Sequence, residues 1–271
     1  MGTVIYFSFF CLLISVYVAV RKLLASADTF LGYAAGLIGA VCLIYLALVL
    51  FFNSFARAAD DRSHIAVVDT GANIPAGYAR YICNDNSHLD LTNQGLNDVN
   101  GHGTNIAGIL AKSMNPTRQC LQIIKWYHNQ EHYEKMRKLY LLEYLSSRSL
   151  KHALKYKAKF VNLSYGGPEP YPEEYRELMN LLNTGAIVAI AAGNEAVNLD
   201  NACNYYPACY AIAKKNFHVV GNKGSGSTNY GNRVTDWANG NNVEGFGVVL
   251  TGTSQATAVW LSEEIKRAYR R

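Results

Sequence analysis

Four short segments of the chain carry the groups that an acyl-transfer reaction needs. They are residues 65–71 (IAVVDTG), 102–108 (HGTNIAG), 191–195 (AAGNE) and 252–258 (GTSQATA). A serine hydroxyl attacks a carbonyl group only when a base removes its proton, so Ser254 needs the imidazole of His102. The imidazole in turn needs a carboxylate that fixes its tautomer, and Asp69 can supply one.

The tetrahedral intermediate of acyl transfer also needs donors for its oxyanion, which the side-chain amide of Asn194 and the backbone N–H of Ser254 can provide. Each segment alone is weak: HGT also begins helices, GTS also forms turns, and VVDTGA resembles the half-site of an aspartic protease. The aspartic protease interpretation requires a second DTG or a homodimer, and it leaves His102 and Ser254 without a role. The four segments together therefore favour a serine nucleophile.

With these motifs in this order, the chain resembles the subtilisin family of serine proteases, the subtilases, which use the order Asp, His, Ser. Three further segments extend the resemblance. Residues 160–168 (FVNLSYGGP) resemble the substrate-binding strand of the family, 185–195 (GAIVAIAAGNE) the strand before its oxyanion asparagine, and 227–231 (STNYG) a segment upstream of its nucleophile. The resemblance covers residues 63–271. It departs at Ala258, where the family usually has proline, and this affects the expected start of the last helix rather than the general base.

The resemblance implies a serine endopeptidase that hydrolyses peptide bonds through an acyl-enzyme. Its implied catalytic residues are Ser254 as nucleophile, His102 as general base, Asp69 as the orienting carboxylate and Asn194 as oxyanion donor. The expected partner is a peptide or protein substrate. It would bind as an additional strand along the backbone of Ser164, Tyr165 and Gly166.

Two alternatives use the same fold. A transpeptidase or maturation protease would form the same acyl-enzyme and pass the acyl group to a different acceptor. A non-catalytic, peptide-binding regulatory membrane protein would keep the fold without the reaction. The intact set of four groups argues against the second alternative, because a site that decays usually loses one of them.

Alternating strand and helix patterns predict an α/β domain over residues 58–271, with a subtilisin-like parallel sheet and helices on both faces. Buried strands are expected at 65–68, 121–126, 160–163 and 187–191, and helices after His102, at 133–158, at 173–182 and after Ser254. This puts Asp69 at the carboxyl end of a strand, with His102 and Ser254 at helix starts. Ligands bind at such positions in open α/β sheets.

The excess of apolar residues lies near the amino terminus. Residues 3–20 carry no charge across 18 positions, and residues 30–52 carry none across 23. Because a bilayer core needs about 20 helical residues, the sequence predicts a two-helix transmembrane hairpin over 1–57, with spans at about 3–20 and 30–53. The alternative for the first run is a cleaved signal peptide with an Ala25-Ser26-Ala27 site. No basic segment precedes that run, and Arg21 and Lys22 separate it from the site.

The hairpin implies a multi-pass membrane protein with the lipid bilayer as a partner. Two basic residues lie in the connection and two follow the second span, so charge alone leaves the orientation open. Cys203 and Cys209 are close enough in sequence to be bridged. If they pair, the catalytic domain is extracytoplasmic; otherwise they are ordinary thiols. We expect the extracytoplasmic orientation.

Other partners are limited by composition. The net charge of +5 is too small to require nucleic acid, and Cys83 and Cys120 lack the spacing of metal ligands, so neither a metal nor a cofactor is expected. Subtilases are commonly made with an amino-terminal pro-domain. Only about ten residues separate the second span from Ser63, so we expect that such a domain is lacking. A separate inhibitor or chaperone protein, or the membrane, is expected to replace it unless the domain folds unaided.

Overall fold

The structure, a computed structural model, describes residues 60–139, 142–201, 203–210 and 212–270, together with five single residues before position 46. The chain divides into two compact units, Met1–Ala58 and Ala59–Arg271. The predicted transmembrane hairpin lies outside the described residues and stays a prediction. Within the described ranges, the structure contains no helix with both the length and the apolar character needed to cross a bilayer.

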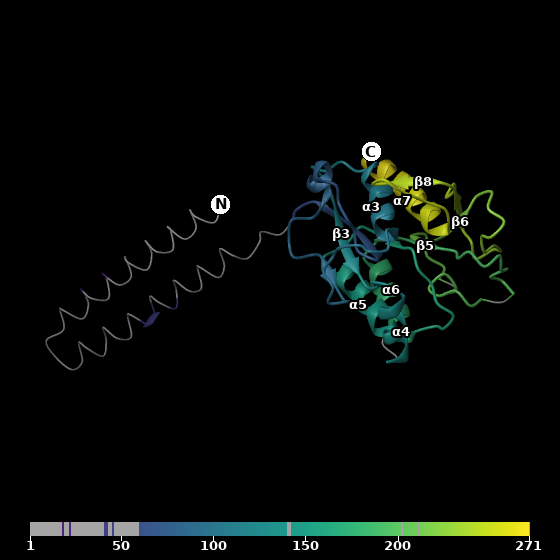
Figure 1. Cartoon of the computed structure of the whole chain (residues 1–271), viewed down its shortest axis with the longest axis horizontal. Helices are drawn as coiled ribbons and strands as arrows, with labels where there is room; N and C mark the ends of the chain where they lie inside the picture. The colour runs from purple at the N-terminus through teal and green to yellow at the C-terminus, as the bar shows by residue number, and fades with distance from the viewer. Residues whose placement is uncertain are drawn as a thin grey trace. The chain divides into compact units, whose positions relative to one another are not determined.

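A parallel sheet of seven strands lies at the centre of the second unit (Figure 1). In spatial order its strands are β2 (Leu89–Asp90), β3 (Gln119–Lys125), β1 (Ser63–Asp69), β4 (Phe160–Leu163), β5 (Ile187–Ala191), β6 (Phe217–Asn222) and β7 (Asp236–Ala238). The central strands are buried on both faces, as parallel strands covered by helices must be. Two further strands, β8 (Val243–Gly245) and β9 (Val248–Leu250), form an antiparallel hairpin.

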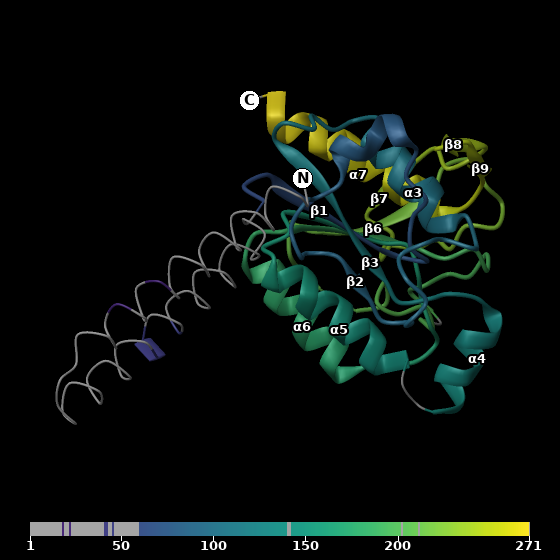
Figure 2. The same ribbon diagram turned by 60° about the vertical axis from the view of Figure 1, so that its left-hand side comes forward.

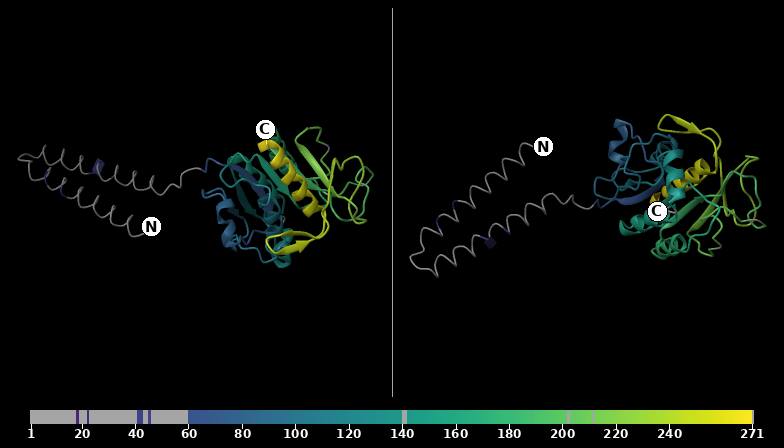
Figure 3. Two further views of the ribbon diagram at one scale, coloured as in Figure 1. Left: turned by 90° about the horizontal axis from the view of Figure 1, so that it is seen from above. Right: turned by 60° about the horizontal axis from the view of Figure 1, so that its bottom comes forward.

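Helices cover both faces of the sheet (Figure 2). Helices α3 (His102–Ala111) and α7 (Thr253–Arg270) pack on one face, and α5 (Leu142–Lys155) and α6 (Pro172–Asn183) on the other. The remaining helical segments are α4 (Gln130–Lys138) and the 3-10 turn η1 (Ala76–Tyr81). Each face of the sheet encloses an apolar core, one including Leu150 and Leu178 and the other including Ile106 and Leu261. Helix α7, drawn in yellow, lies against the sheet in the views of Figure 3.

The order of the strands places a switch point at the carboxyl end of β1, which is where open α/β sheets have a crevice. Strand β1 pairs with β3 on one side and with β4 on the other. The strands that follow β1 along the chain are therefore added first on one side of it and then on the other. Loops diverge at such a switch point, and open α/β sheets bind ligands there. Asp69 is the last residue of β1, and Ser164 directly follows β4. Both residues therefore lie at this crevice.

Most of the predicted elements are confirmed. The four expected strands are β1, β3, β4 and β5, and the expected helices after His102, at 173–182 and after Ser254 are α3, α6 and α7. The single helix expected over 133–158 is wrong, because α4 and α5 divide this segment. The side chain of Asn129 caps α4 by accepting a 2.9 Å hydrogen bond from His132 N–H, so this helix begins before the predicted start. Helix α4 has no buried residue, whereas α5 packs against the sheet.

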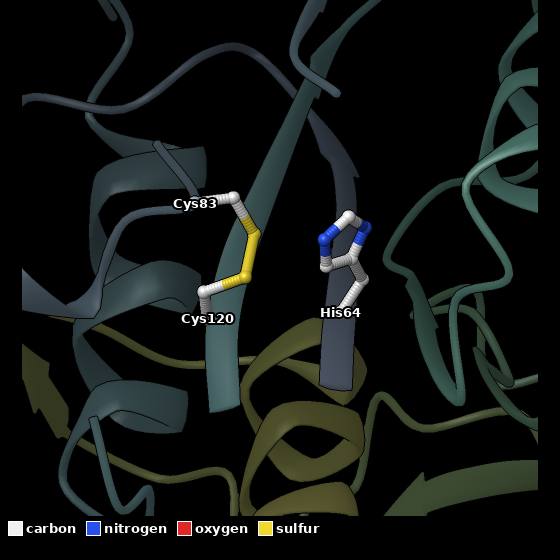
Figure 4. A group of neighbouring side chains, drawn as sticks. All are labelled: His64, Cys83 and Cys120. Atoms are coloured by element: carbon white, nitrogen blue, oxygen red, sulfur yellow. A yellow bond between two sulfur atoms is a disulfide. The ribbon is translucent and has the colours of Figure 1, made fainter. Parts of the chain in front are cut away.

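Two disulfides join residues of the second unit, Cys203–Cys209 and Cys83–Cys120. The first is the pair that the sequence left open, and the second was not anticipated. His64 of β1 lies beside Cys120 of β3, and its ring faces the Cys83–Cys120 disulfide (Figure 4). Metal ions bind thiolates, and these two sulfur atoms are bonded to each other. The cluster is therefore a buried cross-link of β3 with a neighbouring histidine.

Candidate active site

Asp69 and His102 meet at the crevice. Asp69 Oδ1 lies 2.7 Å from His102 Nδ1 and also accepts a 2.8 Å hydrogen bond from Thr70 N–H. Since a carboxylate accepts, His102 Nδ1 carries the proton, and Nε2 is the free basic nitrogen. Asp69 is 4% exposed, whereas the His102 side chain is 26% exposed and accessible from the crevice.

Glycine at position 103 permits this close approach. A Cβ atom at Gly103 would lie 2.2 Å from Gly71 O and 3.1 Å from Asp69 Oδ1. Any larger residue would push α3 away from the end of β1. The HG pair in the HGT motif therefore supplies the imidazole together with the space that lets it reach Asp69.

A second carboxylate, Asp98, supports the start of α3, and sequence reasoning missed it. Its Oδ1 accepts hydrogen bonds of 2.9 Å from Thr70 Oγ1 and from the N–H groups of residues 100 and 101. Its Oδ2 accepts hydrogen bonds from Thr104. Burial by itself would raise the pKa of Asp98. The hydrogen bonds, led by those of Thr104, outweigh burial and hold the pKa below its ordinary value. The only sequence signal was the turn-forming DVNG segment before His102.

These carboxylates set the proton affinity of His102. Burial lowers the pKa of His102, but the charge of Asp69, the Asp69 hydrogen bond and the charge of Asp98 together outweigh it. The resulting pKa lies above the ordinary 6.5. An imidazole held this way is a stronger base than a free one and gains stability when it becomes positively charged.

Ser254 is the second residue of α7 and is 9% exposed. Its hydroxyl donates a long hydrogen bond of 3.4 Å to Ser164 O, the backbone carbonyl just past β4. In the part of the chain that the structure describes, no hydrogen bond connects this hydroxyl to His102. The structure thus joins two of the three triad candidates and leaves the hydroxyl turned toward the predicted substrate strand.

Asn105 fixes α3 relative to α7. Its Oδ1 accepts a 3.0 Å hydrogen bond from Gln255 Nε2, and its Nδ2 donates to Val243 O and Val248 O of the β8–β9 hairpin at 2.9 and 2.7 Å. Asn105 is fully buried. Because it lies one turn after His102, and Gln255 directly follows Ser254, this network holds the imidazole and the hydroxyl on facing helices.

The amide of Asn194 is oriented by the start of α7. Its Oδ1 accepts a 3.0 Å hydrogen bond from Thr253 N–H, and Thr253 Oγ1 accepts a 3.1 Å hydrogen bond from Gly193 N–H. Because the carbonyl end is engaged, the Nδ2 end of the amide is directed away from Thr253. Asn194 itself is exposed, so Nδ2 is available to a bound group.

Asn229 holds the loop that carries Asn194, and it is a second residue that sequence reasoning missed. Its Nδ2 donates to Ala192 O at 2.9 Å and to Glu195 Oε2 at 2.7 Å, and its Oδ1 accepts from Glu195 N–H and Val197 N–H at 3.2 and 2.9 Å. Its side chain is fully buried. The STNYG segment was the signal, although its role was not evident without the contacts.

The predicted substrate strand follows β4 along the rim of the crevice. Tyr165 is anchored by a 2.9 Å contact between its hydroxyl and Ser146 Oγ and by its ring, whose centroid lies 4.9 Å from that of Trp126. Gly167 pairs with Tyr206 in an antiparallel bridge. Within the described ranges, the backbone N–H and C=O of Tyr165 and Gly166 form no hydrogen bond with another backbone group. They are available to an added strand.

Residues 60–261 match the subtilase family, Peptidase S8. The "Major intracellular serine protease" of Bacillus subtilis (strain 168) is 26% identical over 173 residues, which cover 54% of this chain and 47% of that protein. The "Intracellular serine protease" of Paenibacillus polymyxa is 28% identical over 192 residues, which cover 66% of this chain and 53% of that protein. The chain thus spans about half the length of the curated relatives it matches.

Solved structures with the same fold include three proteases. A lanthipeptide protease matches with a TM-score of 0.60 at 16% identity, over 81% of this chain and 79% of that one. MycP1 with its N-terminal propeptide removed matches with a TM-score of 0.59 at 19% identity, over 82% of each chain. The prenylagaramide maturation protease PagA matches with a TM-score of 0.54 at 19% identity, over 79% of this chain and 77% of that one. At these identities the likeness shows the fold, and the match over residues 60–261 shows the family: the chain belongs to the subtilases.

Proposed function

We propose that the protein is a serine endopeptidase anchored to a membrane, and that it hydrolyses peptide bonds through an acyl-enzyme on Ser254. The 2.7 Å contact between Asp69 and His102, at the start of a helix that packs against α7, carries the proposal. It supplies a base of raised pKa on α3, and Ser254 lies at the N-terminus of the neighbouring helix α7. In this proposal Asp69 orients His102, and Asn194 stabilises the oxyanion.

The hydrogen bond from Ser254 to Ser164 O suggests how a substrate activates the site. A peptide that binds along residues 164–166 offers its own N–H to that carbonyl group. The long 3.4 Å bond of the Ser254 hydroxyl is then replaced, and the hydroxyl is released to rotate toward His102 Nε2. The nucleophile and the base would thus become connected when the substrate strand is in place.

The reaction proceeds in two steps. His102 Nε2 takes the Ser254 proton as Oγ bonds to the substrate carbonyl carbon, and the protonated imidazole then gives that proton to the leaving amine as the C–N bond breaks. A water molecule, deprotonated by the same nitrogen, then attacks the carbonyl carbon of the acyl-enzyme. The imidazolium returns that proton to Ser254 Oγ as the ester C–O bond breaks and the acid is released. In both steps the oxyanion receives hydrogen bonds from Asn194 Nδ2 and Ser254 N–H.

An active-site probe tests the proposal. A fluorophosphonate reagent should label purified protein once, and Ser254→Ala or His102→Ala should abolish both labelling and peptide hydrolysis. Two variants are matched controls. Ser262→Ala removes another hydroxyl of α7, and His218→Gln removes another histidine that contacts a carboxylate, Asp236, at 2.9 Å. Both should retain labelling.

Each contrary outcome has a distinct meaning. Persistent labelling of Ser254→Ala refutes the nucleophile, and a wild type that neither labels nor cleaves peptides identifies a non-catalytic peptide-binding protein. A wild type that labels, but transfers the acyl group to an added amine in preference to water, is a transpeptidase. Mass spectrometry of the products separates hydrolysis from transfer.

The anchor and the orientation are separate parts of the proposal. The two uncharged runs within residues 3–52 support the anchor. The two disulfides favour an extracytoplasmic domain, because disulfides persist in oxidising compartments. This departs from the two curated relatives, whose names describe them as intracellular.

Rapid alkylation of intact cells tests the orientation. The four paired cysteines should resist alkylation until a reductant is added, and external protease should remove the carboxyl-terminal end. Alkylated Cys203 and Cys209 in cells with a protected carboxyl terminus would place the domain in the cytoplasm.

A further inference from the structure

The ring of Tyr205 lies between two glycines of the proposed active site. A Cβ atom at Gly166 would lie 2.3 Å from Tyr205 Cε1, and a Cβ atom at Gly193 would lie 3.0 Å from Tyr205 Cδ2. Opposite edges of one ring therefore contact the two backbone segments. Gly166 belongs to the predicted substrate strand, and Gly193 directly precedes Asn194. The ring occupies the space between the two.

A substrate side chain is directed into this same space. The scissile carbonyl carbon must reach Ser254 Oγ, and its oxygen must reach Asn194 Nδ2. When the peptide also pairs with residues 164–166, the Cα of the residue before the scissile bond is held between the backbone at Gly166 and the backbone at Gly193. Gly166 and Gly193 flank the space for the side chain of that residue, which we call the slot, and the Tyr205 ring occupies it. On the Gly193 side, Asn229 Nδ2 and Glu195 Oε2 also border this space, at 2.3 and 2.5 Å from the position of a Cβ atom.

The loop around Tyr205 holds the ring in the slot. The Cys203–Cys209 disulfide closes the loop, and Cys209 N–H donates a 3.0 Å hydrogen bond to Tyr205 O. The next residue, Tyr206, exchanges hydrogen bonds of 2.9 and 2.7 Å with Gly167. The loop is thereby tied to the substrate strand itself.

The phenol group of Tyr205 stays neutral in this position. Burial and the Glu195 carboxylate both raise its pKa above the ordinary value. The slot therefore contains an uncharged aromatic ring with restricted movement.

We propose that Tyr205 is a specificity-determining residue that closes the pocket for the side chain before the scissile bond, so that the enzyme cleaves after glycine or alanine and rejects larger residues. This inference rests on the proposed peptidase function. A large side chain at that position must displace the ring together with a cross-linked loop. One methylene alone discriminates by roughly 10- to 200-fold in an enzyme pocket, so exclusion of a whole aromatic side chain should reach at least about 100-fold.

Peptide p-nitroanilides that differ only in the residue before the scissile bond test the inference. The full-length protein in detergent should cleave the glycine or alanine substrate with kcat/KM at least about 100-fold above that for leucine or phenylalanine. Tyr205→Ala should raise kcat/KM for the phenylalanine substrate about 100-fold and leave the alanine substrate within a few-fold. Tyr205→Phe, which keeps the ring, is the matched control and should retain the wild-type preference. Tyr205→Val also removes the ring and enlarges the pocket, and it takes the place of the alanine variant if that variant folds poorly.

Fluorophosphonate titration of Ser254 normalises every rate to the number of active sites. A labelled wild type that cleaves after phenylalanine as fast as after alanine overturns the inference and leaves the proposed function intact. So does a labelled Tyr205→Ala or Tyr205→Val variant with the wild-type preference. A wild type that neither labels nor cleaves any of the substrates overturns the proposed function, and the inference with it.

Discussion

Asp98 Oδ2 accepts two hydrogen bonds from Thr104, one from the backbone N–H at 2.8 Å and one from the hydroxyl at 2.7 Å. Thr104 lies in the first turn of α3, the helix that begins at His102. A carboxylate at this position stabilises the helix N-terminus and adds negative charge close to the imidazole. Asp98 is therefore a positioning residue for His102, and its effect on the base can be measured.

Asp98→Asn should shift the acidic limb of the kcat/KM profile to lower pH. His102 acts as a base only when it is neutral, and the charge of Asp98 raises its pKa. Removal of that charge lowers the His102 pKa, so the neutral base persists in more acidic solution. The pH dependence of peptide hydrolysis measures the shift. Asp236→Asn, which affects the His218 pair and does not act on the His102 pKa, should leave the limb unmoved. An unchanged limb in Asp98→Asn would show that Asp98 has a structural role only.

The same carboxylate should make folding sensitive to acid. The folded-state pKa of Asp98 is depressed, so its contribution is present above the unfolded pKa of about 3.9 and is lost as the pH falls through the folded value. Asp98→Asn should lower the free energy of unfolding by about 1–3 kcal/mol at neutral pH, because a buried amide cannot accept all of these hydrogen bonds. The loss should become smaller below about pH 4, because the free energy of unfolding of the wild type decreases there as well. Urea unfolding across this range measures it, and a loss of constant size down to pH 2 would contradict the account.

Asn194→Asp tests the oxyanion donor more sharply than alanine does. Aspartate keeps an oxygen that accepts from Thr253 N–H, so the start of α7 is retained, but it cannot donate to an oxyanion. We expect kcat to fall by about 10²- to 10³-fold with KM little changed, and Asn194→Ala to give a similar loss. Asn201→Ala, at an exposed turn, is the control. A rise in KM with kcat unchanged would mean that Asn194 contacts the ground state.

The sequence was sufficient for groups that act through their own side-chain chemistry. Asp69 and His102 could be paired from their residue types and from the pattern around them, because Asp69 ends a predicted strand and His102 begins a predicted helix. Asn229 and Asp98 could not be placed, because their function lies in hydrogen bonds to backbone groups far along the chain, and residue type does not specify those partners. Tyr205 was missed for a similar reason. A tyrosine between two cysteines shows no pattern, and only folding brings its ring between Gly166 and Gly193.

Helix α4 shows a second limit of the sequence. Its Tyr133 and Met136 continued the apolar helical spacing of α5, so the segment was predicted as one helix. Burial separates them: α4 lies on the surface, and α5 packs on the sheet. Periodicity alone cannot locate a break between an exposed helix and a buried one when both carry the same pattern.

The two disulfides should differ in what they stabilise. Cys83 and Cys120 are 37 residues apart, and Cys203 and Cys209 are 6 apart. Because the entropy that a cross-link removes from the unfolded chain grows with the logarithm of loop length, the long loop contributes about 4 kcal/mol and the short one about 2 kcal/mol. Urea unfolding of Cys83→Ala with Cys120→Ala should therefore show the larger loss of stability.

The short loop should instead govern selectivity, because Tyr205 lies within it. Cys203→Ala with Cys209→Ala should release the ring from the slot and raise kcat/KM for a phenylalanine substrate relative to an alanine substrate. Cys83→Ala with Cys120→Ala should leave that ratio unchanged, because this cross-link lies at the amino end of β3, opposite the end that faces the crevice. Both double variants are compared per fluorophosphonate-labelled site, so partial unfolding does not alter the ratio. If both ratios rose equally, loosening of the whole domain would be the cause, and the Cys203–Cys209 loop would have no specific part in holding Tyr205.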